Sequence, residues 1–80
     1  MTNRQKIGSV IRRHRKLAKL SFRALGQKSG IYYGTLRSLE IGRGKLDASQ
    51  LVLLTQVLGP EFQQEVVRLN TPKANKVSVR

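Results

Sequence analysis

Two adjacent tyrosines, Tyr32 and Tyr33, are the residues of this sequence best suited to recognise another molecule. They are the only tyrosines in the chain, and glycines lie close on both sides, at Gly30 and Gly34. A helix can bury only one of two neighbouring side chains, so we expect at least one ring to face solvent. An exposed tyrosine offers an apolar ring for contact and a hydroxyl for hydrogen bonding.

Positive charge is the second signal, and it is concentrated in the first half of the chain. The 80 residues include 16 Lys and Arg against four Asp and Glu, a net charge of +12. Residues 1–45 hold twelve basic residues and one acidic residue, a net +11, whereas residues 46–80 hold four and three, a net +1. Such a basic half indicates a polyanionic partner, most often nucleic acid. Charge alone leaves DNA, RNA and an anionic membrane surface open.

Catalytic and metal-binding chemistry are not indicated by the pattern of residues. The chain has no cysteine, its single histidine is His14, and its four acidic residues are spread over several segments. A metal at His14 would need further ligands that the sequence does not group with it. We therefore predict no enzyme, no cofactor, no metal and no small-molecule ligand, and we interpret His14 as a partly buried structural residue.

A membrane location is not expected. The longest apolar run is "LVLL", far short of a membrane span, and the N-terminus has no apolar segment typical of a signal peptide. A membrane-active cationic helix at residues 7–20 is disfavoured because apolar later segments can bury its hydrophobic stripe. We expect a cytoplasmic, nucleoid-associated protein.

Five segments with helical periodicity must hold the tyrosines and the cations in place. We expect helices at about residues 3–18, 22–29, 33–42, 48–59 and 61–70. The expected N-caps of the first, second and fourth are Thr2, Ser21 and Asp47. The predicted fold class is all-α: a compact bundle of about five short helices over residues 1–70, followed by a flexible basic tail at 71–80.

Residues 22–41 have the pattern of a helix-turn-helix, two short helices joined by a tight glycine turn. Gly30 supplies the left-handed turn conformation, and Gly26 makes room for a helix that crosses closely. Leu36 and Leu39 mark the buried face of the third helix. The outward face then carries Tyr33, Gly34 and Arg37.

In this order and spacing, residues 7–59 resemble the lambda-repressor-like, Cro/C1-type (XRE) family of DNA-binding domains. The matching segments are "IGSVIRRHRK", "LS", "LGQKSGI", "TLRSLEIGRGK" and "LVLLTQVLG". The resemblance implies a sequence-specific regulator of transcription, of phage or mobile-element repressor type, that reads the DNA major groove with the third helix. Controller proteins and antitoxins share the fold and size. A basic RNA-binding or ribosome-associated protein is the alternative.

The resemblance also implies roles for individual residues. We expect base contacts from Tyr32, Tyr33, Gly34, Arg37 and Ser38. We expect phosphate contacts from Phe22 through its backbone amide, and from Arg23, Lys28, Thr35, Arg43 and Lys45. Family members commonly have glutamine at the position of Phe22, so this residue is a departure from the pattern.

Three of these expectations are more specific. Within the tyrosine pair, Tyr33 is expected on the bases and Tyr32 partly packed near the DNA backbone. Arg37 is suited equally to guanine and to phosphate. The family pairs the positions of Arg15 and Glu40, so we predict an ion pair that links the first helix to the end of the third.

A single recognition helix reads few base pairs, so we predict a homodimer on two half-sites. Residues 58–70 carry little net charge and present several apolar side chains after the fourth helix has closed the core. The predicted dimer interface consists of Leu58, Phe62, Val66 and Leu69. The alternative is that Phe62 and Val66 seal the core of the monomer.

Overall fold

The helices begin where short polar side chains can cap them. A computed structural model describes residues 2–70 of the chain. Thr2 Oγ1 accepts the backbone amide of Gln5 at 3.1 Å, and Asp47 Oδ1 accepts that of Gln50 at 2.7 Å. Ser21 Oγ caps the second helix in the chain by accepting the backbone amide of Ala24 at 3.0 Å. Each such cap contributes about 1 kcal/mol to stability, and all three were predicted from the sequence.

The described residues form five α-helices and no strand. They are α1 (Asn3–Leu17), α2 (Phe22–Ser29), α3 (Tyr33–Glu40), α4 (Ala48–Leu58) and α5 (Pro60–Asn70). The all-α prediction is confirmed, and the predicted helix bounds differ from these by two residues at most. The predicted tail, residues 71–80, lies outside the described residues. Among residues 2–70, no helix combines the length and apolarity needed to cross a membrane.

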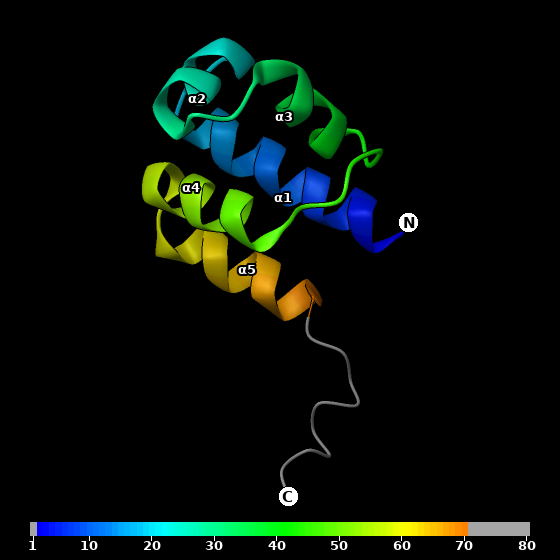
Figure 1. Cartoon of the computed structure of the whole chain (residues 1–80). Helices are drawn as coiled ribbons and strands as arrows, with labels where there is room; N and C mark the ends of the chain where they lie inside the picture. The colour runs from blue at the N-terminus through cyan, green and yellow to red at the C-terminus, as the bar shows by residue number, and fades with distance from the viewer. Residues whose placement is uncertain (1, 71–80) are drawn as a thin grey trace, which may run out of the picture.

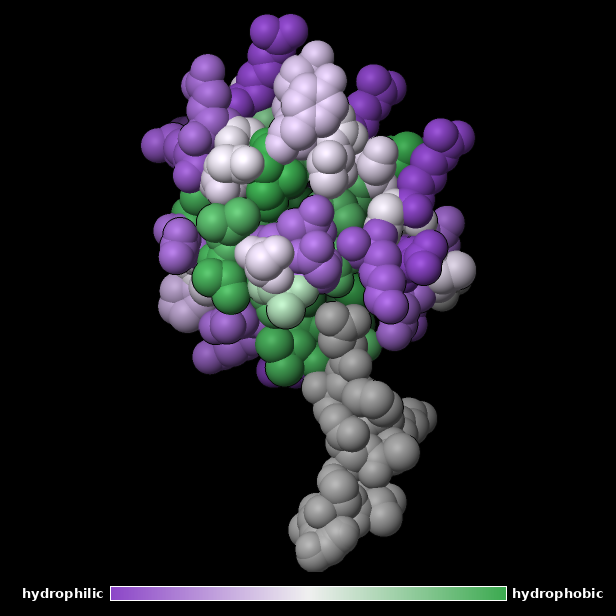
Figure 2. All heavy atoms as spheres, viewed as in Figure 1, coloured by the Kyte–Doolittle hydropathy of each residue, from purple (hydrophilic) through white to green (hydrophobic). Residues whose placement is uncertain are grey.

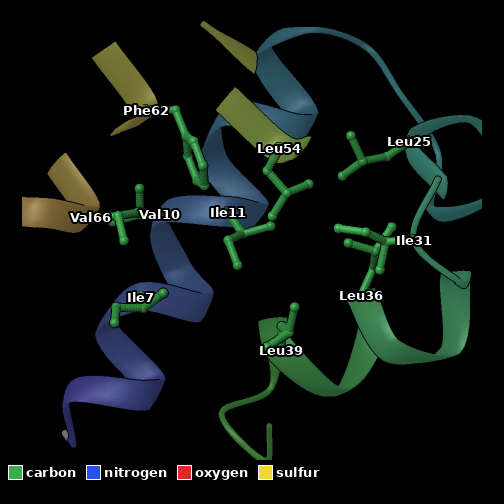
Figure 3. Close-up of a cluster of buried hydrophobic side chains, with 10 residues drawn as sticks. All are labelled: Ile7, Val10, Ile11, Leu25, Ile31, Leu36, Leu39, Leu54, Phe62 and Val66. Atoms are coloured by element: carbon green, nitrogen blue, oxygen red, sulfur yellow. The ribbon is translucent and has the colours of Figure 1, made fainter. Parts of the chain in front are cut away.

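The bundle is organised around α1, which packs against both α3 and α5 (Figure 1). The short helix α2 packs against α3 and α4, and α4 packs against α5. Every helix, together with the link between α2 and α3, contributes to one hydrophobic core (Figure 3). The core consists of Ile7, Val10, Ile11, Leu25, Ile31, Leu36, Leu39, Leu54, Phe62 and Val66.

At two glycines, the backbone of a helix lies directly against the backbone of another segment. A Cβ on Gly26 would lie 2.8 Å from the carbonyl oxygen of Ile31, which confirms the expected close approach in α2. A Cβ on Gly8 would lie within 3.0 Å of the carbonyl oxygens of Leu39 and Glu40. The end of α3 therefore rests directly on the backbone of α1 at Gly8, a contact that the sequence interpretation missed.

Helix α5 is fastened to α1 by a polar cluster around Glu65. Its carboxylate binds the guanidinium of Arg13 and Nε2 of His14, and the ring of His14 lies edge-on to Phe62 with centroids 5.7 Å apart. The hydrogen bonds from Arg13 and His14 lower the pKa of Glu65 to about 2, so this carboxyl is ionised at neutral pH. The half-buried His14 thus has the structural role expected of it.

The proposed dimer interface is wrong at two of its four residues. Phe62 and Val66 are fully buried in the core of the single chain. The reason is that α5 lies along α1, so its apolar stripe faces inward rather than outward. Leu58 and Leu69 are half-buried and pack against the same core. The alternative reading, in which Phe62 and Val66 seal the monomer, is the one observed.

One helix end carries an unusual backbone conformation. The amides of Lys19 and Leu20 donate to the carbonyls of Lys16 and Arg15, at 2.9 and 3.1 Å, and so close α1. This motif places the residue after the C-cap in the left-handed region, where glycine is preferred. Lys19 occupies that position with φ 60°, the single non-glycine residue of positive φ in the described chain.

Replacing Lys19 with glycine is expected to raise the free energy of unfolding by about 1 kcal/mol, because the left-handed conformation is costly for a residue with a Cβ. Lys19→Ala is the matched control, since it removes the same charge and keeps the Cβ. Urea denaturation of the three proteins measures the difference. Equal stability of the glycine and alanine variants would contradict this account.

Candidate nucleic-acid interface

The link between α1 and the end of α3 is the most elaborate polar contact of the described chain. Arg15 Nε donates to Glu40 Oε2 at 2.6 Å, and its Nη2 donates to Oε1 at 3.2 Å. Its third nitrogen donates to the carbonyl of Leu20 at 2.8 Å. The Glu40 side chain is 3% exposed and that of Arg15 is 11% exposed. The ion pair predicted from the resemblance therefore forms, and it fixes α3 relative to α1.

Phe22, where the related family commonly has glutamine, packs into this same link. The guanidinium carbon of Arg15 lies 4.2 Å from the centre of the Phe22 ring, a cation–π contact. The ring is half-buried against the core, so only the backbone amide of Phe22 remains suited to an outside anion. The first amides of a helix have no partner within the helix, which leaves this part of the expectation open.

The two tyrosines are arranged opposite to the expectation. Tyr32 is 68% exposed, whereas Tyr33 is 40% exposed. Tyr33 is the more covered because the guanidinium of Arg23 lies 5.1 Å from its ring centre and its Cβ lies beside Gly26. The prediction that Tyr32 is the packed member of the pair is wrong. The two rings contact each other, with centroids 4.8 Å apart and planes tilted by 51°.

Gly34, for which a base contact was expected, lies beneath the ring of Tyr32. A Cβ at this position would lie 3.1 Å from Cδ2 of Tyr32 and closer still to the neighbouring ring atom. The ring of Tyr32 therefore lies across Gly34 and covers it. The glycine serves to seat the aromatic ring on the first turn of α3.

The remaining predicted contacts separate into exposed and half-buried residues. Thr35 and Ser38 are half-buried, and the carbonyl of Ser38 accepts the amides of Arg43 and Gly44 at 2.9 and 3.2 Å. The other predicted residues are five exposed cations, which we call the flanking cations: Arg23, Lys28, Arg37, Arg43 and Lys45. None of them belongs to an ion pair within residues 2–70. Their charges are available to an external anion.

The flanking cations lie on α2, on α3 and in the loop after α3. Figure 2 shows hydrophilic side chains projecting from the end of the molecule formed by α2 and α3, whereas much of the hydrophobic surface in this view lies over α4 and α5. Because the three described ion pairs use only Arg13, His14 and Arg15 as cations, the positive field around α3 is not neutralised within residues 2–70.

A hollow of about 570 Å³ lies beside the tyrosines, and we call it the α2–α3 hollow. Both tyrosines, Ile31, Arg23 and Gln27 line it together with the glycines around the turn. No acidic residue is among the lining residues. The sequence analysis did not single out Gln27; its spacing of one helical turn from Arg23 was the available signal.

The fold and this surface define a small all-α domain with an uncompensated basic end. No protein-family model matches the chain. The comparisons with curated proteins and with solved structures likewise give no significant match.

Proposed function

We propose that this domain binds double-stranded DNA in a sequence-specific manner and regulates transcription, as a repressor of phage or mobile-element type. Its place in the cell is then the cytoplasm, on the nucleoid. The observation that carries the proposal is the exposed face of α3, with two aromatic rings and Arg37, between cations that no residue of the described chain neutralises. The resemblance to lambda-repressor-like domains supports it.

The distribution of charge suits a helix placed in the major groove. The groove is about 12 Å wide and admits one helix, and phosphates line both of its edges. Arg23 and Lys28 precede α3 in the chain, and Arg43 and Lys45 follow it. In this proposal the four contact phosphates on the two edges, while the side chains of α3 contact base edges. The Arg15–Glu40 pair holds α3 at a fixed angle to the rest of the domain.

Two arginine substitutions separate base contacts from phosphate contacts. A cognate duplex is first selected from a randomised pool. If Arg37 contacts a base, Arg37→Ala is expected to weaken binding to that duplex by about 1–3 kcal/mol and binding to random duplex less. Arg43→Ala is expected to weaken both about equally and to reduce the magnitude of the salt slope of log K by about one, because one phosphate contact is lost. Binding titrations across a range of salt concentrations measure both quantities.

Arg68→Ala is the matched control, because this exposed arginine lies on α5, outside the α2–α3 unit. Its affinity for the selected duplex should stay closest to that of the unchanged protein. Affinity that is independent of salt, or preference for single-stranded RNA over every duplex, would refute the proposed function. The second result would favour the RNA-binding alternative.

A further inference from the structure

Tyr32 is an exposed aromatic ring held in one position. Its ring is supported on one side by Gly34 and contacts the ring of Tyr33. Tyr33 is in turn held by the guanidinium of Arg23. A ring supported in this way loses little conformational freedom on binding, which favours its use as a contact.

The side chains of the two adjacent tyrosines interact with each other. A side-chain hydrogen bond with Tyr33 raises the pKa of Tyr32 above its ordinary value. Tyr32 is 68% exposed, so much of its apolar ring is open to a partner. The ring can contact an apolar group but offers little hydrogen-bonding discrimination of its own.

The α2–α3 hollow lies directly beside this ring. Ile31 and the two tyrosines give it apolar walls, while Arg23 and Gln27 add hydrogen-bond donors. The surroundings are cationic, with no acidic residue in the lining. Such a hollow suits a small apolar group carried by a polyanion.

We propose that Tyr32 contacts the C5-methyl group of a thymine. In this proposal the base stays paired in the duplex, and its methyl group projects from the major groove into the α2–α3 hollow. The inference rests on the proposed function and names the chemical group that this part of the site recognises. In the major groove of unmodified DNA, thymine is the one base that presents a methyl group. Tyr33 and Gly34 are positioning residues, because they act by holding the ring of Tyr32.

Removing the methyl group from DNA tests the contact without changing the protein. Deoxyuridine keeps the hydrogen-bonding groups of thymine and lacks only the C5-methyl. Replacing the thymines of the selected duplex one at a time is expected to identify a position at which affinity falls about fourfold, the effect of one buried methyl group. The other positions should change less.

Two variants at Tyr32 connect this position to the ring. Tyr32→Phe removes the hydroxyl and keeps the ring, so it should still distinguish thymine from deoxyuridine. Tyr32→Ala should bind the two duplexes with nearly equal affinity. Gly34→Ala is the matched test of positioning: alanine favours a helix and should leave the domain at least as stable, yet its Cβ must displace the ring. This variant should therefore lose the discrimination while remaining folded.

The possible results separate the two proposals. Tight binding of the thymine duplex with no loss at any deoxyuridine position would overturn the methyl contact and leave the proposed function standing. Discrimination that survives in Tyr32→Ala would also overturn it, because another residue would then contact the methyl. Failure to bind any duplex would refute the proposed function, and the methyl contact with it.

Discussion

Replacing Glu40 with glutamine is expected to lower the free energy of unfolding by about 3 kcal/mol. The substitution leaves the guanidinium of Arg15 buried without a negative partner, and breaking one side of a buried ion pair typically costs 3–5 kcal/mol. We expect the lower end of that range because Arg15 keeps its hydrogen bond to Leu20 and its contact with the Phe22 ring. Urea denaturation measures the loss.

One smaller effect opposes this loss and a second adds to it. Glu40 is the last residue of α3, where a negative charge interacts unfavourably with the helix dipole by about 0.3–1 kcal/mol at an exposed position. The substitution also removes a negative charge from a positively charged domain. The attraction between that charge and more distant cations is then lost, which lowers stability by an amount that salt screens only in part. Neither effect matches the desolvation of an unpaired guanidinium.

Glu65→Gln is the matched control because the Glu65 carboxylate, which contacts Arg13 and His14, is itself far more exposed than that of Glu40. The Arg13 and Glu65 side chains are 53% and 33% exposed, against 11% and 3% for Arg15 and Glu40. Exposed ion pairs are worth at most about 1 kcal/mol, so the control should be clearly the milder of the two. If Glu40→Gln were as stable as the unchanged protein and kept its preference for the selected duplex, the Arg15–Glu40 pair would not be what positions α3.

The parts of the fold that depend on local sequence were predictable. Thr2, Ser21 and Asp47 cap helices because their side chains reach amides only three residues ahead. Gly30 ends α2 with φ 81° because the turn itself requires it. These features need no knowledge of the tertiary structure, and the helix bounds follow from them together with the hydrophobic period.

The features that were missed depend on where helices cross. Gly8 lies inside the apolar stripe of α1, as Gly26 lies inside α2, but only the packing of α3 across α1 gives Gly8 its role. The order of exposure within the tyrosine pair was wrong for the same reason. The helical period of the sequence does not show that Arg23 covers Tyr33. Nor does it show that the ring of Tyr32 packs on Gly34.

The predicted dimer interface was wrong at Phe62 and Val66 because the apolar face of α5 has two possible partners, a second chain or α1. The sequence shows that α5 has an apolar stripe, but it does not show which of the two partners the stripe packs against. Phe62 and Val66 point into the core in Figure 3, among side chains of α1 and α4. The homodimer itself stays a prediction.

Phe62→Ala is expected to lower the free energy of unfolding by about 3–5 kcal/mol, the usual cost of truncating a buried phenylalanine. Phe62 is fully buried and contacts the edge of the His14 ring, so the cavity would lie between α1 and α5. A small domain has about 5–15 kcal/mol of stability in total, so the variant should be close to unfolding. Gln63→Ala, at the exposed neighbouring position, should be within about 0.5 kcal/mol of the unchanged protein.

The same variant decides whether Phe62 belongs to a core or to an interface. If Phe62 acts within one chain, the loss of stability measured by denaturation is the same at every protein concentration, and the folded fraction keeps the sedimentation behaviour of the unchanged protein. If Phe62 acted between chains, the unchanged protein would become more stable with concentration, and Phe62→Ala would give a folded monomer of nearly unchanged stability. Because the side chain has no exposed surface in the single chain, we expect the first result.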